Sequence, residues 1–190
     1  EFVEEGPEVE LADLSEYIDG EAGRVTSITG QLVMDYKKGV FTCDSPRAQA
    51  AAGFLGEAGS IRLSEVSVDC ENDYASVAVV SLDGEPLAES ASVLVQIGTN
   101  GQPAGRQVRP ATVEKKKQTF QGFEITRYGE SPWMVEKAQL TLRIQNNRIS
   151  EAIPVDANGY ASGEPFALER TPVGTVTVPV PEDTLYVVLR

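Results

Sequence analysis

Acidic side chains are the most abundant groups in this sequence that could do chemistry. The 190 residues include 29 Asp and Glu, and enzymes hydrolyse glycosidic bonds with two carboxyl groups about 5–10 Å apart, one with a raised pKa. Six carboxylates lie near the ends of predicted strands, where they could converge: Asp35, Asp44, Glu65, Asp69, Glu71 and Asp73. Because so many carboxylates also produce close pairs by chance, the pattern favours a solvated surface, and we assign no catalytic residue.

Histidine is absent from the chain. Its absence removes Ser-His-Asp and Cys-His nucleophile activation and most zinc sites. Metal sites with oxygen ligands remain open, and the run D-A-N-G-Y at residues 156–160 is similar to part of a calcium loop. That run lacks the further acidic positions of an EF-hand. It therefore predicts a hairpin turn, and we expect neither a metal nor a cofactor.

Aromatic side chains are the groups that would contact a sugar, because flat rings stack on the C–H faces of pyranoses. Three of them fall at predicted turns or strand ends, namely Tyr128, Trp133 and Tyr160. Aromatic residues are only 7% of the chain, with a single tryptophan. This small number favours packing of the rings in the core or at its rim, and a carbohydrate platform is the alternative.

Two cysteines, Cys43 and Cys70, share strand faces with apolar neighbours. The alternation predicts that both side chains point into the core. There they would be two buried thiols acting as small hydrophobes. A disulfide between them is the alternative if their strands face one another, and it would support export.

Short β-strands must position all of these residues. Runs rich in Val, Thr and Ile recur every 10–15 residues, and eleven prolines and seventeen glycines punctuate them. The candidate strands are residues 31–36, 40–43, 60–70, 75–81, 87–97, 106–113, 122–127, 135–145, 148–155, 164–168, 174–180 and 184–189. This spacing predicts an all-β fold, a two-sheet antiparallel β-sandwich of jelly-roll-like or Ig-like type. At most one or two short helices are expected, with the alanine-rich residues 46–55 as a helix or an ordered loop.

Charge divides the chain into two parts. The net charge is −13, and nine of the 29 acidic residues lie in the first 22 positions. The rest carries 20 acidic and 16 basic residues, a net −4. We predict an acidic linker or short helical lead-in over residues 1–24, packed by Leu11, Leu14 and Ile18, and a β-sandwich domain over 25–190.

Charge and hydropathy argue against two kinds of partner, nucleic acid and a membrane into which the chain would insert. The one basic run, residues 115–117, lies between strand-like segments and predicts a charged loop, whereas phosphate binding needs clustered Lys and Arg. No apolar stretch approaches the roughly 18 residues that span a bilayer. The chain begins Glu1-Phe2. We expect it to be a piece of a longer protein, so the missing signal peptide says nothing about export.

Short runs along the chain carry a family resemblance. They are D-S-P-R-A-Q at 44–49, G-F-L at 53–55, S-L-D-G-E-P-L-A-E-S at 81–90, P-W-M-V-E at 132–136 and D-A-N-G at 156–159. In this order they resemble segments found late in large bacterial glycoside-hydrolase-like proteins. The likeness covers about residues 25–190, and none of the runs is catalytic.

The resemblance implies a non-catalytic C-terminal β-sandwich that follows a catalytic barrel. The partner would be the catalytic domain of the same parent chain, with polysaccharide as a further contact, in a secreted or cell-surface protein. Within this domain, Arg47 and Gln49 could contact a sugar hydroxyl or the neighbouring domain. The pattern favours a structural role of the 44–49 run at the strand exit, with Asp44 capping a turn and Arg47 in a buried carboxylate fork. A domain that packs on a barrel should also expose an apolar patch larger than those of ordinary monomers.

Two other functions remain open from the sequence. An autonomous carbohydrate-binding module would show an exposed coplanar set of tyrosine and tryptophan rings. A cell-surface adhesion or assembly domain would show a large apolar or edge-strand surface that its own chain does not use.

Overall fold

The computed structural model describes residues 13–116 and 118–190, and it confirms the all-β prediction. Every strand pairing in this part of the chain is antiparallel, and the strands form two packed sheets and two small ribbons. The helical elements are a 3-10 turn at Ser15–Tyr17 and a single-turn helix α1 at Leu55–Ala58. Among the described residues, no helix is long and apolar enough to cross a bilayer.

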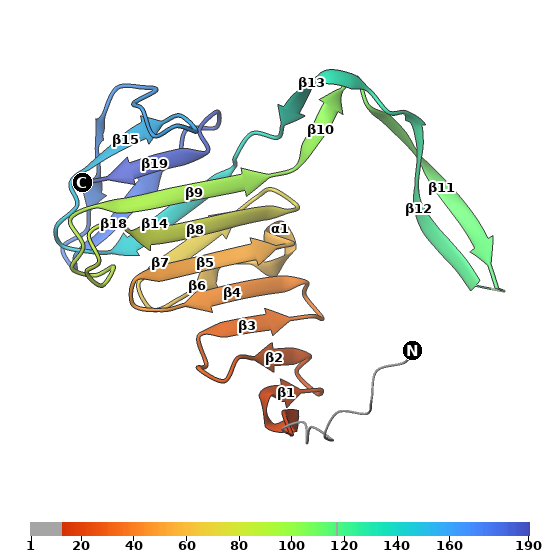
Figure 1. Ribbon diagram of the computed structural model, residues 1–190, viewed down its shortest axis with the longest axis horizontal. Helices are drawn as coiled ribbons and strands as arrows, with labels where there is room; N and C mark the ends of the chain where they lie inside the picture. The colour runs from red at the N-terminus through yellow and green to blue at the C-terminus, as the bar shows by residue number, and fades with distance from the viewer. Residues whose placement is uncertain (1–12, 117) are drawn as a thin grey trace, which may run out of the picture.

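The first sheet, called the large sheet here, has ten strands. In spatial order they are β1 (Ile18–Asp19), β2 (Arg24–Thr26), β3 (Leu32–Asp35), β4 (Val40–Asp44), β5 (Ala48–Gly53), β8 (Ala75–Ser81), β9 (Val93–Thr99), β19 (Tyr186–Leu189), β15 (Glu151–Val155) and β16 (Phe166–Ala167). Strands β1 to β5 form a meander at one end of it (Figure 1).

The second sheet, called the small sheet, has five strands and packs on one face of the large sheet. Their order is β17 (Glu169–Arg170), β18 (Thr175–Pro179), β14 (Leu140–Gln145), β7 (Val66–Cys70) and β6 (Ile61–Arg62). The core lies between the two sheets. Alternate residues of each strand fill it, such as Leu142 and Ile144 from the small sheet against Val77, Val79 and Val95 from the large one.

Residues 101–135 form a projection that we call the arm. It consists of two ribbons, β10 (Gly101–Ala104) with β13 (Glu130–Val135) and β11 (Gln107–Lys115) with β12 (Gln118–Arg127). Register shifts interrupt both ribbons near their junction. The arm leaves the end of β9 and extends away from the sandwich (Figure 1).

The expected helix or loop over residues 46–55 is wrong. Most of this run is strand β5, which pairs with β4 on one side and β8 on the other. Alanine has the highest intrinsic helix propensity, but pairing in the middle of a sheet overrides that preference. Only the residues from Leu55 onward turn into α1.

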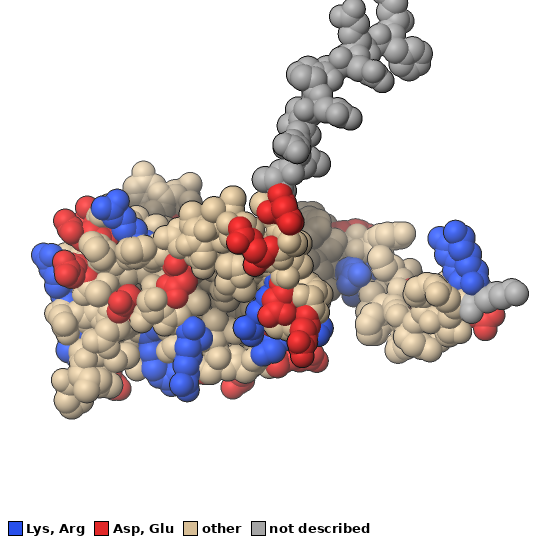
Figure 2. Space-filling model, turned by 90° about the horizontal axis from the view of Figure 1, so that it is seen from below, with Lys and Arg blue, Asp and Glu red and all other residues tan. Residues whose placement is uncertain are grey.

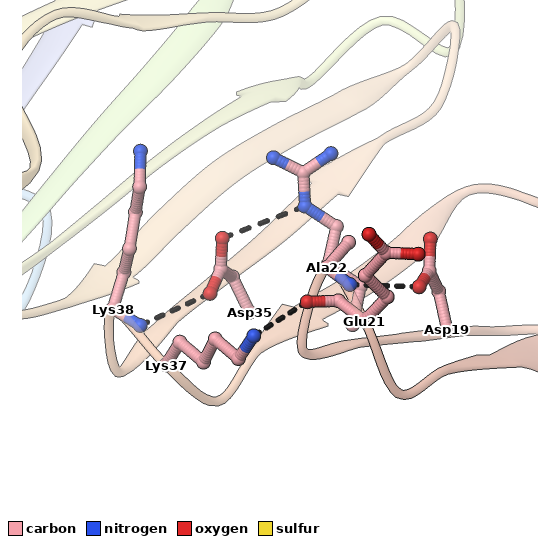
Figure 3. A network of polar contacts seen from close by, with 7 residues as sticks. Asp19, Glu21, Ala22, Asp35, Lys37 and Lys38 are labelled. Atoms are coloured by element: carbon pink, nitrogen blue, oxygen red, sulfur yellow. Dashed lines mark hydrogen bonds and ion pairs between the residues drawn. The ribbon is translucent and has the colours of Figure 1, made fainter.

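The N-terminal segment joins the large sheet through β1 and β2. Polar contacts fix this meander (Figure 3): the Asp35 carboxylate accepts hydrogen bonds from the Lys38 amide at 3.0 Å and from Arg24 at 3.5 Å. The Lys38 amide, and after it Arg24, hold the pKa of Asp35 below its ordinary value. Leu14 and Ile18 are both exposed. Leu11 lies outside the described residues.

Candidate docking interface

The outward face of the large sheet has small residues along its centre. In β5 the side chains of Gln49 and Ala51 face the core and Gly53 is buried in the same alternation, so Ala48, Ala50 and Ala52 face outward. On the neighbouring strand β8, the outward residues are Ser76, Ala78 and Val80. Two adjacent strands therefore present a nearly flat floor, because five of these six outward side chains are Ala or Ser.

Larger apolar side chains border this floor on both sides. Toward the N-terminal edge, a cross-strand row runs through Ile18, Val25, Met34 and Phe41, which face one another in register. Their exposure lies between 37% for Phe41 and 53% for Ile18. On the opposite side, a second row of Leu94, Val188 and Ile153 crosses β9, β19 and β15. We call the floor with its two borders the outer apolar face.

Counted across the sheet from β1 to β19, no charged side chain occupies an outward position on these eight strands of the large sheet. Those positions are Ile18, Val25, Leu32, Met34, Phe41, Cys43, Ala48, Ala50, Ala52, Ser76, Ala78, Val80, Leu94, Gln96, Gly98, Tyr186 and Val188. Antiparallel sheets with a solvated face normally alternate between apolar and polar residues. The outward face of the large sheet lacks this alternation with charged residues over these eight strands, which is the pattern of a face that is covered.

The outward face of the small sheet has the opposite character. Its outward residues are polar, among them Ser67 and Thr141, and Arg143 makes an ion pair with Asp69 across two strands. The hydrogen bond from Arg143 holds the pKa of Asp69 below its ordinary value. This face is suited to water.

The arm adds apolar surface at one end of the molecule. Cross-strand pairs place Val108 opposite Ile125 and Pro110 opposite Phe123, and the large side chains of these pairs are exposed. The arm also carries charged residues, with ion pairs of Arg109 with Glu124 and of Arg127 with Glu130 along its length. Basic residues lie at its tip, where β11 ends at Lys115 (Figure 2). An isolated ribbon of two strands is marginally stable in water. We therefore infer that the arm, like the outer apolar face, is shaped to lie against another surface.

The three aromatic residues proposed for sugar contact fall in two places. Trp133 lies in β13 opposite Pro103, and Tyr128 lies between β12 and β13, so both belong to the arm. Tyr160 lies in the loop after β15. All three are exposed, at 69%, 76% and 74%, and none takes part in the ring contact found among the described residues, which joins Phe54 and Tyr74. The structure thus keeps Tyr160 off the arm.

The expectation that both cysteines point into the core is confirmed for Cys70 and wrong for Cys43, and no disulfide joins them. Cys43 follows Phe41 on the outward side of β4, because its neighbour Thr42 pairs with the buried Ala51. Cys70 lies on the core side of β7 in the other sheet. Both are free thiols. Burial raises the pKa of the Cys70 thiol.

The predicted structural role of residues 44–49 at the strand exit is confirmed only in part. The Oδ2 atom of Asp44 accepts hydrogen bonds from the amide and hydroxyl of Ser64, both at 3.0 Å, so Asp44 joins the two sheets rather than capping its own turn. Ser45 closes that turn through Ala48. Arg47 is exposed, and none of the ion pairs among the described residues includes it. The buried fork is therefore wrong.

The six carboxylates considered for hydrolysis do not gather in one hollow of the surface. Asp73 lies beside Phe54, Asp35 lies under the N-terminal meander, and Asp44 lies at the β4–β5 turn. Glu65 shares the hollow of Asp44, and Asp69 and Glu71 share another. Hydrogen bonds lower the pKa of Asp35 and Asp69, whereas a general acid needs a raised one.

Sequence reasoning missed the polar groups that fix the loop between β8 and β9. Asp83 accepts hydrogen bonds from the hydroxyls of Ser81 and Ser90 at 2.9 and 2.8 Å and from the Ala91 amide at 2.7 Å. These bonds, with Ser90 first, hold the pKa of Asp83 far below its ordinary value. The spacing of serine and aspartate in the 81–90 run was the available signal. Nothing local marked the buried Asn146, which donates to the carbonyls of residues 87 and 90.

Comparisons of the chain with known proteins found no similar protein. No family model, no curated protein and no solved structure matches the chain.

Proposed function

We propose that this chain is a non-catalytic accessory β-sandwich of a secreted or cell-surface glycoside-hydrolase-like protein, where it buttresses the catalytic domain and contacts polysaccharide. The observation that carries the proposal is the outer apolar face. A sheet face without charge over eight strands is costly to leave in water, and burial of its exposed side chains favours association by on the order of 1 kcal/mol for each large residue. The resemblance of the short runs to segments of glycoside-hydrolase-like proteins supports the choice of the catalytic domain as the partner.

The arm supports the same arrangement. It projects from the end of the large sheet and exposes apolar pairs such as Val108 with Ile125. A projection of this kind extends the contact surface beyond the sandwich, and it gains order when it lies against a partner. We expect the arm and the outer apolar face to contact the same neighbouring domain.

Calorimetry of the parent protein tests the docking. Ala50→Glu places a charge on the floor of the outer apolar face, and Ser67→Glu places the same charge on the small sheet beside Arg143. We expect Ala50→Glu to lower the unfolding temperature of the parent protein and to separate one joint transition into two. Ser67→Glu should leave the joint transition intact. Equal behaviour of the two variants would refute the docking face.

The second candidate function, an autonomous carbohydrate-binding module, is favoured by the exposed rings of Trp133 and Tyr128 on the arm. Affinity electrophoresis against plant, algal and microbial polysaccharides separates the two functions. Retardation by one polymer that Trp133→Ala abolishes would establish the module and place its site on the arm. If no polymer retards the domain, the accessory role stands alone.

A further inference from the structure

A hollow opens at the end of the sandwich from which the arm also leaves. Its volume is about 530 Å³, and its walls come from the β3–β4 turn, the end of β5, helix α1 and the loop before β8. The strand register places these segments at one end, because Gly53 lies opposite Ala75, and Ala75 lies opposite Thr99, where β9 continues into the arm (Figure 1). Ligand sites are commonly concave regions of about 300–1,000 Å³. None of the described residues that line this hollow belongs to the outer apolar face.

Backbone contacts hold the walls of the hollow in place. The Phe54 amide donates to the Gly39 carbonyl at 3.2 Å, and the Gly56 amide donates to the Asn72 carbonyl at 3.0 Å. A Cβ atom on Gly53 would lie 2.0 Å from the Gly39 carbonyl oxygen, so only glycine permits this approach. The side chain of Asn72 is buried and is hydrogen-bonded to two backbone groups just before β14. The hollow is therefore preformed.

Two aromatic side chains give the hollow an apolar wall that is open to solvent. Phe54 is 53% exposed and Tyr36 is 49% exposed, and both line the hollow. The ring of Phe54 lies against Gly39 and meets the ring of Tyr74 edge to face, with 5.6 Å between the centroids and 80° between the planes. These contacts fix the Phe54 ring while about half of the side chain stays accessible. An accessible ring held in this way is a surface on which the C–H face of a sugar can stack.

Charged groups of both signs surround the two rings. Glu57 and Asp73 line the hollow, and neither carboxylate makes an ion pair with a described residue. Lys38 lines it too, and none of the ion pairs within the described ranges includes its ammonium group. The ammonium group of Lys37 is engaged, because it donates to the Glu21 carbonyl. The hollow thus offers carboxylate acceptors and an ammonium donor to a ligand.

This combination favours a neutral ligand that carries hydroxyl groups. An anion would be repelled by the carboxylates of Glu57 and Asp73, and a cation would be repelled by the ammonium group of Lys38. A purely apolar ligand would take these charged groups out of water without replacing their hydrogen bonds. A sugar has hydroxyl groups that donate to carboxylates and accept from an ammonium group, and its C–H face packs on aromatic rings.

We propose that this hollow binds one neutral sugar unit of a polysaccharide, with the C–H face of the sugar on Phe54 and Tyr36 and its hydroxyl groups bonded to Glu57, Asp73 and Lys38. The proposal deepens the polysaccharide contact in the proposed function and rests on it, but it uses neither the outer apolar face nor Trp133. Because the hollow opens at the end from which the arm leaves, the polysaccharide approaches the sandwich from that end.

Nuclear magnetic resonance of this chain tests the site through the ring resonances of Phe54 and Tyr36. The probes are five uncharged oligosaccharides: cellotetraose, xylotetraose, mannotetraose, laminaritetraose and galactotetraose. We expect one of them to shift both sets of ring resonances in a saturable way. Phe54→Leu keeps an apolar side chain but removes the flat ring, so it should weaken that binding at least about tenfold. Tyr160→Leu removes an exposed ring from the loop after β15 and should leave the binding unchanged.

A second variant covers the case in which Phe54→Leu disturbs the fold, because the Phe54 ring also packs on Gly39 and Tyr74. Tyr36 is half exposed, and Tyr36→Leu should weaken binding several-fold while the amide spectrum of the free chain stays that of a folded protein. Full binding by a folded Tyr36→Leu variant would count against the site.

The opposite results are equally specific. If none of the oligosaccharides shifts the ring resonances of Phe54 and Tyr36, the inference is wrong, and it is also wrong if the zwitterion diglycine shifts them instead. Retardation by a polymer that depends on Trp133, with unchanged ring resonances in the hollow, would place the sugar on the arm and overturn the hollow alone. The calorimetric test of the docking face is independent of all these outcomes, so failure here is distinguishable from failure of the accessory role.

Discussion

The outward faces of the two sheets differ in the polarity of their residues. The outward residues of the small sheet alternate with its core residues as polar with apolar, and Asp69 and Arg143 form an ion pair in water. From β1 to β19 in spatial order, the outward residues of the large sheet are uncharged, and five of the six on β5 and β8 at its centre are Ala or Ser. One fold thus carries one charged outward face and one uncharged outward face. Which face of a sheet meets water is decided by the composition of its outward positions, not by its topology.

The largest expected effect separates the core from the outer apolar face. Leu142→Ala removes a fully buried side chain between the sheets and should lower the free energy of unfolding of the isolated domain by about 2–5 kcal/mol. Leu94→Ala removes a side chain of the same type from the outward side of β9, where it is only half-buried. It should cost less than half as much. Urea denaturation of both variants measures the difference, and equal costs would mean that the outward face is already part of a core.

A smaller effect concerns what the outer apolar face binds when it is uncovered. The isolated domain should bind the dye anilinonaphthalene sulfonate, because the dye adsorbs to exposed apolar surface. Phe41→Lys should reduce its fluorescence several-fold without lowering the free energy of unfolding by more than about 1 kcal/mol. Val173→Lys alters an exposed valine in the loop between β17 and β18 of the small sheet and should leave the fluorescence unchanged. An unchanged signal in Phe41→Lys would place the exposed apolar surface elsewhere.

The smallest effect belongs to the ion pair of the small sheet. The folded-state pKa of Asp69 is lowered, so its contribution to stability is present above the unfolded-state pKa of about 3.9 and is lost as the pH falls through the lower folded value. Both side chains are more than a third exposed, so screening limits the contribution to about 0.5 kcal/mol at neutral pH.

Asp69→Asn tests that contribution. In this variant the free energy of unfolding should no longer fall on account of this pair between about pH 4 and the lower folded pKa. The destabilisation that the substitution causes at pH 7 should be smaller in high salt. Leu94→Ala should show no such dependence on salt screening. If Asp69→Asn costs as much at high salt as at low salt, the small-sheet face is held by more than electrostatics.

The strands of the sandwich were largely predictable, because alternation marks them directly. Residues 75–81 were expected as a strand, and β8 spans those residues. Alternation does not say whether the outward side is covered, so Cys43 was assigned to the wrong face beside Phe41. Local composition also failed at β5, where pairing with two neighbours outweighed the helix preference of alanine.

The arm and the candidate sites could not be predicted, because they arise from contacts between residues that are far apart in the sequence. Residues 106–113 and 122–127 were expected as strands, but nothing in their pattern shows that they leave the sandwich. Gln49 was singled out by its place in the 44–49 run, yet the hydrogen bond that its Oε1 atom accepts from the Glu65 amide forms only when β5 packs against the segment of Glu65. The role of Asn146 is apparent only from the structure, because the carbonyls that accept its hydrogen bonds lie more than fifty residues away in the chain.

Thiol labelling of Cys43 tests the central claim most directly, because this half-buried side chain lies on the outer apolar face itself. In a Cys70→Ser background, iodoacetamide should alkylate Cys43 in the isolated domain and should react at least about tenfold more slowly when the domain is part of its parent protein. A reporter cysteine introduced by Ser67→Cys on the small sheet should react at the same rate in both. Equal rates for Cys43 in the isolated domain and in the parent protein would show that the outer apolar face stays open to water, and would contradict the docking account.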